Sequence, residues 1–103
     1  MEFSQIQSFV EAERRGSFRK AAKTLYVSQS AVSNRIRLLE TELGAELFYR
    51  FRNGVVLTEA GRAFLPYATR ALYALNEAKQ VVPTNRASGR NLITIASTRV
   101  LGT

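Results

Sequence analysis

Five side chains that can form hydrogen bonds fall on one side of a short segment that begins at residue 29. On a helix with about 100° per residue they occupy roughly 0° to 140°. They are Gln29, Ser30, Ser33, Asn34 and Arg37, and together we call them the polar stripe. Amide, hydroxyl and guanidinium groups can donate to, or accept from, the edges of base pairs. The polar stripe is therefore a candidate surface for reading nucleic acid.

The element that must position the polar stripe is a helix over about residues 29–43. Its opposite side is apolar, with residues near roughly 280° to 340° that would face a core. These residues are Val32, Ile36, Leu39 and Leu43. Ser28 is a good N-cap and Gly44 a good C-terminal stop for such a helix. An ordinary soluble face usually mixes Glu with Lys and Arg, but this segment has no acid before Glu40.

Charge supports the same interpretation. The 103 residues carry 15 Lys and Arg against 8 Asp and Glu, a formal net charge of +7. Residues 14–37 hold seven of the basic residues and no acid. An excess of this size favours a polyanionic partner, with nucleic acid ahead of an anionic membrane.

Several classes of protein are excluded by composition. The chain has no Cys and no His, so a disulfide framework, a thiolate zinc site and a His-based catalytic triad are not available. No pair of nucleophile and base is indicated, and we expect no enzyme activity, no metal and no cofactor. The N-terminus lacks the features of a signal peptide, and no window is apolar enough to span a bilayer. We expect a cytoplasmic protein with no membrane partner.

Two shorter helices precede the segment at residue 29. Residues 3–13 have helical apolar spacing, and Gly16 is expected to end that helix. Ser17 can cap a second helix from Phe18 to Leu25, and Tyr26 with Val27 makes a brief turn. The order of helix, short helix, turn and polar-striped helix predicts a helix-turn-helix.

A β-hairpin is predicted next, over residues 47–57. Two β-prone runs flank Asn53-Gly54, a strong signal for a two-residue hairpin turn. Arg50 and Arg52 alternate with Phe51 and so share a face. A basic hairpin after a helix-turn-helix is typical of a wing. An ordinary hairpin that packs Phe48 and Leu57 on the core is compatible with it.

A long helix is expected from about Glu59 to Val82, capped by Thr58. Its apolar stripe consists of Leu65, Ala68, Leu72, Leu75 and Val82. A helix of this length is longer than the small domain formed by the preceding residues can cover. The uncovered part of its apolar stripe therefore predicts a partner chain. Pro66 should cost a hydrogen bond or introduce a bend, and Pro83 should end the helix. Residues 84–91 are expected to form a linker, and the strand-like 92–96 suggests a chain cut just inside a second domain.

Many positions match a known family in register. They are the run GSFRKAAKTLYVSQSAVS at 16–33, then Ile36, Leu39-Glu40, Leu43-Gly44, Leu47-Phe48, Arg50 and Leu57-Thr58-Glu59-Ala60-Gly61. These residues resemble the LysR-type transcriptional regulators, and the resemblance covers residues 1 to about 82. It implies a mainly α fold, with three helices and a hairpin wing followed by a long dimerisation helix. The implied boundaries are 1–58 for the winged helix-turn-helix, 59–83 for the linker helix, 84–91 for a hinge and 92–103 for the start of an effector-binding domain.

The same resemblance implies roles for individual residues. The polar stripe would contact bases in the major groove of operator DNA, and Arg52 and Asn53 would lie at the minor groove. Phosphate contacts would come from Ser17, Arg19, Lys20, Ser28, Arg35 and Arg50. Homodimers would form through the stripe of the long helix, and the full-length protein could form tetramers. A small-molecule effector would act only through the missing domain.

Three other functions are consistent with parts of the sequence. A non-specific basic protein that coats DNA or RNA needs the charge but no polar stripe. A module for protein interaction would use the long helix and leave the charge incidental. A helix lying on a membrane is less favoured, since the far side of residues 59–82 mixes acidic and basic groups. Preference for a selected DNA site over random DNA separates a sequence-specific reader from the first of these. Absence of any DNA binding at low salt would favour the second.

Overall fold

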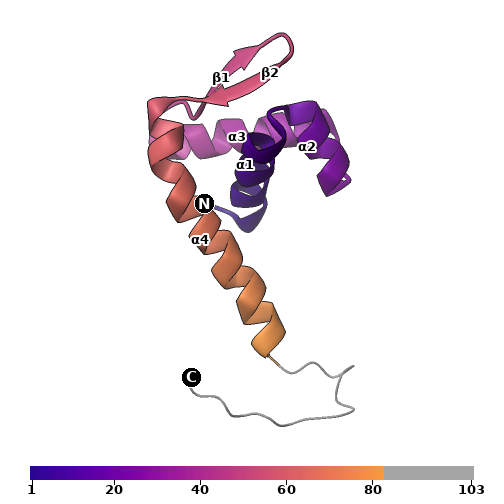
Figure 1. Cartoon of the computed structure of the whole chain (residues 1–103), viewed down its shortest axis with the longest axis vertical. Helices are drawn as coiled ribbons and strands as arrows, with labels where there is room; N and C mark the ends of the chain where they lie inside the picture. Colours follow the sequence, from indigo (N-terminus) through magenta and orange to yellow (C-terminus); the bar gives the residue numbers. More distant parts are fainter. Residues whose placement is uncertain (83–103) are drawn as a thin grey trace. The chain divides into compact units, whose positions relative to one another are not determined.

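A computed structural model describes residues 1–82 as four helices and a two-stranded antiparallel hairpin (Figure 1). The elements are α1 (Phe3–Arg15), α2 (Phe18–Leu25), α3 (Gln29–Leu43), β1 (Phe48–Phe51), β2 (Gly54–Leu57) and α4 (Glu59–Val81). Residues 1–73 form one compact unit, and the rest of α4 belongs to a second unit. The winged helix-turn-helix is confirmed. Pro83 and the expected linker and strand over 84–103 lie outside the described residues.

The predicted helix caps are present. Ser17 Oγ accepts a hydrogen bond from Lys20 N at 3.1 Å, and Ser28 Oγ accepts one from Ala31 N at the same distance. Thr58 Oγ1 accepts from Gly61 N at 3.0 Å at the start of α4. Gly16 and Gly44 end α1 and α3 in the left-handed conformation. Serine side chains therefore set the starts of α2 and α3, and glycine backbones set the ends of α1 and α3, as expected from the sequence.

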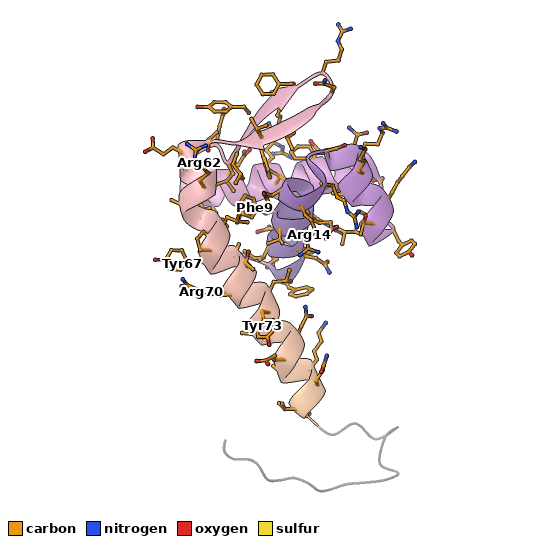
Figure 2. All side chains as sticks on the ribbon, viewed as in Figure 1. Phe9, Arg14, Arg62, Tyr67, Arg70 and Tyr73 are labelled. Atoms are coloured by element: carbon orange, nitrogen blue, oxygen red, sulfur yellow. The ribbon has the colours of Figure 1, made fainter. Side chains whose placement is uncertain are left out.

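Aromatic rings join the elements of the first unit. The Phe9 ring of α1 lies 5.3 Å from that of Phe48 in β1 and 5.2 Å from that of Phe64 in α4. Phe18 of α2 meets Phe48 edge-on at 5.5 Å. Figure 2 labels Phe9 among the helices of this unit. Because these rings are close-packed, α1, α2, the hairpin and the first part of α4 are held as one framework.

The apolar side of α3 is buried except at its end. Val32, Ile36 and Leu39 are fully buried, as predicted. Leu43 was expected to continue this seam, but its side chain is 37% exposed. It lies in the last turn of α3, immediately before the chain turns at Gly44, where the core no longer covers the helix.

The apolar stripe of α4 divides between two environments. Ala68 is 1% exposed and belongs to the core of its own chain, with Leu65 and Leu72 packed against that core. This burial corrects the assignment of Ala68 to a dimer interface, because a side chain already enclosed in its own unit offers no surface to a partner. Leu75 and Val82 remain 45% and 59% exposed. Pro66 lies inside the helix without ending it.

The hairpin turn lies one residue earlier than predicted. Phe51 pairs with Gly54, so Arg52 and Asn53 form the turn instead of Asn53 and Gly54. Val55 N donates to Gly16 O at 3.0 Å, which fastens β2 to the end of α1. A Cβ at Gly54, where φ is +156°, would lie 2.5 Å from Gly16 O. The glycine is therefore required by this close approach of two backbones.

Candidate nucleic-acid interface

The five residues of the polar stripe lie together on the surface of α3. Gln29, Ser30, Asn34 and Arg37 are exposed, and Ser33 is half-buried. With Ser28 and Ala31, they line one open depression. The opposite side of the same helix is held in the core, so the polar stripe is presented on a rigid element. Its members can therefore reach a flat or convex partner together.

Hydrogen bonds at the start of α3 and within it restrict the side-chain orientations of part of the polar stripe. Arg37 Nη2 donates to Asn34 Oδ1, and Ser28 Oγ lies 3.1 Å from Ser30 Oγ. A guanidinium has five N–H donors and an Asn amide has two, so donors remain on both Arg37 and Asn34 after this contact. The stripe offers donors and acceptors without any acidic side chain.

A second depression lies next to the polar stripe and shares Gln29 and Ser33 with it. Its walls come from the start of α2, from α3 and from the hairpin. Its polar and charged lining residues are Ser17, Arg19, Lys20, Gln29, Ser33, Arg50, Arg52 and Asn53. We call it the basic groove. None of its lining residues is acidic, and α2 begins at its edge, so both side chains and the helix dipole favour an anion there.

The basic groove brings together most residues that the sequence suggested for phosphate contact. Arg19 and Lys20 are exposed in the first turn of α2, while Arg52 and Asn53 are exposed at the hairpin turn. Ser28 lies in the depression of the polar stripe instead. Arg35 is half-buried and lines neither depression.

Arg50, on β1, contacts residues of two other elements. Its Nη2 lies 3.0 Å from Glu40 Oε1, and its guanidinium carbon lies 5.3 Å from the centre of the Phe18 ring. The other oxygen of Glu40 accepts a hydrogen bond from Leu47 N at 2.8 Å. Arg50 thus joins α2, α3 and β1 while about half of its side chain stays exposed.

Sequence reasoning missed Glu40. On the helical wheel it falls at roughly 20°, beside the buried Ile36, which was a signal of partial burial. An acid at that boundary needs a basic partner, and the nearby hairpin holds two arginines. Only the fold decides that the partner is Arg50.

The exposed side of α4 carries aromatic and basic residues. In Figure 2, Tyr67 and Arg70 lie on the side of α4 that points away from the first three helices. The Arg70 guanidinium carbon lies 5.0 Å from the centre of the Tyr67 ring. Tyr67 is largely exposed, so this side of the helix presents an aromatic surface with a positive charge above it.

The described part of the chain contains no group of three or more His, Cys, Asp or Glu residues suited to a metal ion. None of the helices within residues 1–82 is long and apolar enough to cross a membrane.

Comparison with known proteins identifies the family. The profile described as "Bacterial regulatory helix-turn-helix protein, lysR family" matches residues 3–62, more than half of the chain. The chain belongs to the LysR family. This LysR-family chain is 46% identical over 82 residues to the HTH-type transcriptional regulator HdfR of Yersinia enterocolitica. That match covers 80% of the chain and 28% of HdfR, so the chain spans about a quarter of this relative. The relatives are transcriptional regulators and not enzymes.

Solved structures give the same result. The chain is similar to the DNA-binding domain of CbnR in complex with DNA, with a TM-score of 0.74 and 37% identity over 87% of this chain and all of that one. It is also similar to the DNA-binding domain of BenM in complex with benA site 1 DNA. That likeness has a TM-score of 0.72 and 34% identity over 78% of this chain and 90% of that one. The described fold is thus that of a LysR-family DNA-binding domain.

Proposed function

We propose that this LysR-family domain binds operator DNA sequence-specifically, with α3 in the major groove and the hairpin at the minor groove. The observation that carries the proposal is the continuity of two surfaces. The polar stripe and the basic groove share Gln29 and Ser33, and no acidic residue lines either. Groups suited to base edges therefore adjoin groups suited to phosphates, as DNA recognition requires.

Base recognition would come from the polar stripe. The Gln29 amide can donate to and accept from adenine in a bidentate contact. Arg37 can reach a guanine or a phosphate, and its hydrogen bond to Asn34 limits the directions in which it points. Ser30 and Ser33 are short, so they allow the helix to approach the groove closely.

Phosphate contacts would fix the register of α3 on the duplex. Ser17 and Ser28 lie where α2 and α3 begin, and helix N-termini attract phosphate through their amides and dipole. Arg19, Lys20 and Arg50 add positive charge along the basic groove. Arg35, which lines neither depression, would contribute a longer-range attraction.

The hairpin would contact the minor groove. Arg52 and Asn53 form its exposed turn, and an Arg entering a narrow minor groove is attracted by the enhanced negative potential there. The hydrogen bond from Val55 N to Gly16 O keeps β2 against α1, so the turn is presented from a fixed base.

We further propose that two chains pair through α4. Exposed residues recur at spacings of four, three and four, which is the heptad pattern of a helix–helix seam. They are Tyr67, Ala71, Ala74 and Ala78. Leu75 and Val82 flank them, and the half-buried Leu65 and Leu72 could contribute only their exposed edges. Two paired winged helix-turn-helix units would require two half-sites at a set spacing, and so a roughly palindromic operator.

The larger part of a LysR-family regulator would supply the remaining properties. The chain covers 28% of HdfR, so effector binding and tetramer formation would depend on a region outside this chain. The regulator would act in the cytoplasm, where its operator lies.

Selection of bound sequences from random duplex DNA tests the proposal. We expect one enriched sequence with two related half-sites, and a preference for it over random duplex by roughly 10³ or more. Tight binding without enrichment would instead favour a non-specific basic protein, which the net charge of +7 could also support.

A further inference from the structure

Tyr26 ends α2 in a conformation that glycine usually provides. Its φ and ψ are 59° and 43°, in the left-handed region. Tyr26 N donates to Lys23 O at 3.3 Å, and Val27 N donates to Ala22 O at 3.0 Å. This pair of hydrogen bonds is the Schellman motif, in which Tyr26 occupies the position that favours glycine. Among the described residues, Tyr26 is the only non-glycine residue with positive φ.

The chain itself provides a comparison. α1 and α3 also end in the left-handed region, and both use glycine, at Gly16 and Gly44. A residue with a Cβ is disfavoured there by its contact with the following carbonyl group. The Tyr26 side chain does not compensate through packing, because it is 94% exposed. Tyr26 therefore lowers the stability of the isolated chain relative to glycine, which indicates a role outside it.

The backbone holds Tyr26 in a fixed place. Val27, the next residue, packs partly against the core, and Ser28 caps α3 immediately after it. The two hydrogen bonds of the Schellman motif hold the backbone on the preceding side. The ring is thus attached to a rigid turn between α2 and the N-terminus of α3, and ordering this turn costs little when a partner binds.

The charge around Tyr26 indicates which partner it meets. Residues 14–39 contain no acid, and Lys23 lies in the last turn of α2, three residues before Tyr26. A basic stretch of chain of this kind favours an anionic partner over a basic or apolar protein surface. The phenol O–H is a hydrogen-bond donor. Tyr26 is not among the residues that line the depression of the polar stripe. A phosphate oxygen fits both the charge and the donor.

We propose that Tyr26 contacts the DNA backbone and donates a hydrogen bond from its phenol O–H to a phosphate oxygen beside the groove that α3 enters. The proposal rests on the proposed function, because it assumes that α3 binds duplex DNA. It adds a phosphate contact from the turn of the helix-turn-helix, where a conformation unfavourable for folding is retained for binding.

Two substitutions test the proposal in the 103-residue chain. Tyr26→Gly should raise the midpoint of thermal unfolding by roughly 4 °C, because it relieves the left-handed conformation. The same variant should lower the affinity for the selected duplex and for random duplex alike, by roughly tenfold. Stability and affinity then change in opposite directions, which a purely structural role would not produce. Tyr26→Phe should leave the midpoint unchanged and lose most of the same affinity.

Tyr49→Phe is the matched control. Tyr49 is also an exposed tyrosine, on β1, and lines neither the polar stripe nor the basic groove. The Tyr49→Phe variant should retain wild-type affinity for both duplexes. Measurements by thermal unfolding and by fluorescence anisotropy with a labelled duplex give both quantities on one sample.

The outcomes are distinguishable. If the wild type prefers its selected site but Tyr26→Gly and Tyr26→Phe bind as well as the wild type, the phosphate contact is wrong and the proposed function stands. A raised unfolding midpoint in Tyr26→Gly with unchanged affinity for both duplexes would overturn the contact in favour of a protein partner for the exposed ring. A fall in the unfolding midpoint of Tyr26→Gly would overturn the conformational argument. If the wild type shows no preference for any duplex, the proposed function itself fails.

Discussion

Glu40 and Arg50 form an ion pair of 3.0 Å between α3 and β1, and the second oxygen of Glu40 accepts the backbone N–H of Leu47 at 2.8 Å. Glu40 is nearly buried, while Arg50 is about half exposed. One carboxylate therefore links the helix of the polar stripe to the first strand of the hairpin. Through this link the polar stripe and the turn at Arg52 and Asn53 share one framework.

Glu40→Gln should lower the free energy of unfolding by about 1–2 kcal/mol. The amide oxygen can still accept from Leu47 N, but the charge that pairs with Arg50 is lost, and water screens part of that interaction. Urea unfolding measures the change. Glu46→Gln is the control: Glu46 is exposed, and its substitution should change stability by less than about 0.5 kcal/mol. Equal effects of the two substitutions would contradict the assigned role of Glu40.

Gln29→Ala should weaken binding to the selected duplex by about 1–3 kcal/mol and leave binding to random duplex nearly unchanged. The reason is that a bidentate amide contact reads one base, whereas non-specific binding depends on phosphates. Competition binding with both duplexes gives the two values. A similar loss on both duplexes would remove Gln29 from the residues that read bases.

Arg19→Ala should weaken binding to all sequences alike and make the salt dependence shallower. Each phosphate neutralised contributes about 0.9 to the slope of log K against log salt concentration, so that slope should fall by about this amount. Arg19 is exposed at the start of α2, and the fold should not depend on it. Arg50→Ala is a less direct test, since it also removes the contacts to Glu40 and Phe18. An unaltered slope for Arg19→Ala would exclude a phosphate contact there.

If two chains pair through α4 as proposed, Leu75→Asp should yield monomers, while the compact unit of residues 1–73 keeps its unfolding midpoint. Leu75 is exposed on α4, so a charge there opposes a helix–helix seam without entering the core. Leu72→Asp should disturb both properties, because Leu72 packs against the core. Light scattering and thermal unfolding separate the two variants. A dimer that persists in Leu75→Asp would place the seam elsewhere on the chain.

Local signals were sufficient to predict the helices. Ser17 and Ser28 each bond the backbone three residues ahead, and Gly16 and Gly44 end helices by their own conformational freedom. Such interactions involve neighbours within one turn, so their effects can be deduced from the order of residues alone. The same is true of the polar stripe, whose five members share a face because of helical periodicity.

The hairpin shows where local signals fail. Asn53-Gly54 predicted a hairpin and a hairpin is present, but its turn is formed by Arg52 and Asn53. Gly54 is needed because the backbone of Gly16, 38 residues earlier in the chain, lies too close for a Cβ. Turn statistics describe neighbouring residues and cannot include a contact with the end of α1.

The order of residues was thus enough to establish an amphipathic helix at 29–43, a second one after Thr58 and a basic hairpin between them. Tertiary structure decided which surfaces remain available. It enclosed Ala68 in the core of its own chain, paired Glu40 with Arg50, and joined α2, α3 and the hairpin into the basic groove. The physical reason is that periodicity specifies only which residues share a face. What covers that face depends on packing between segments far apart in the chain.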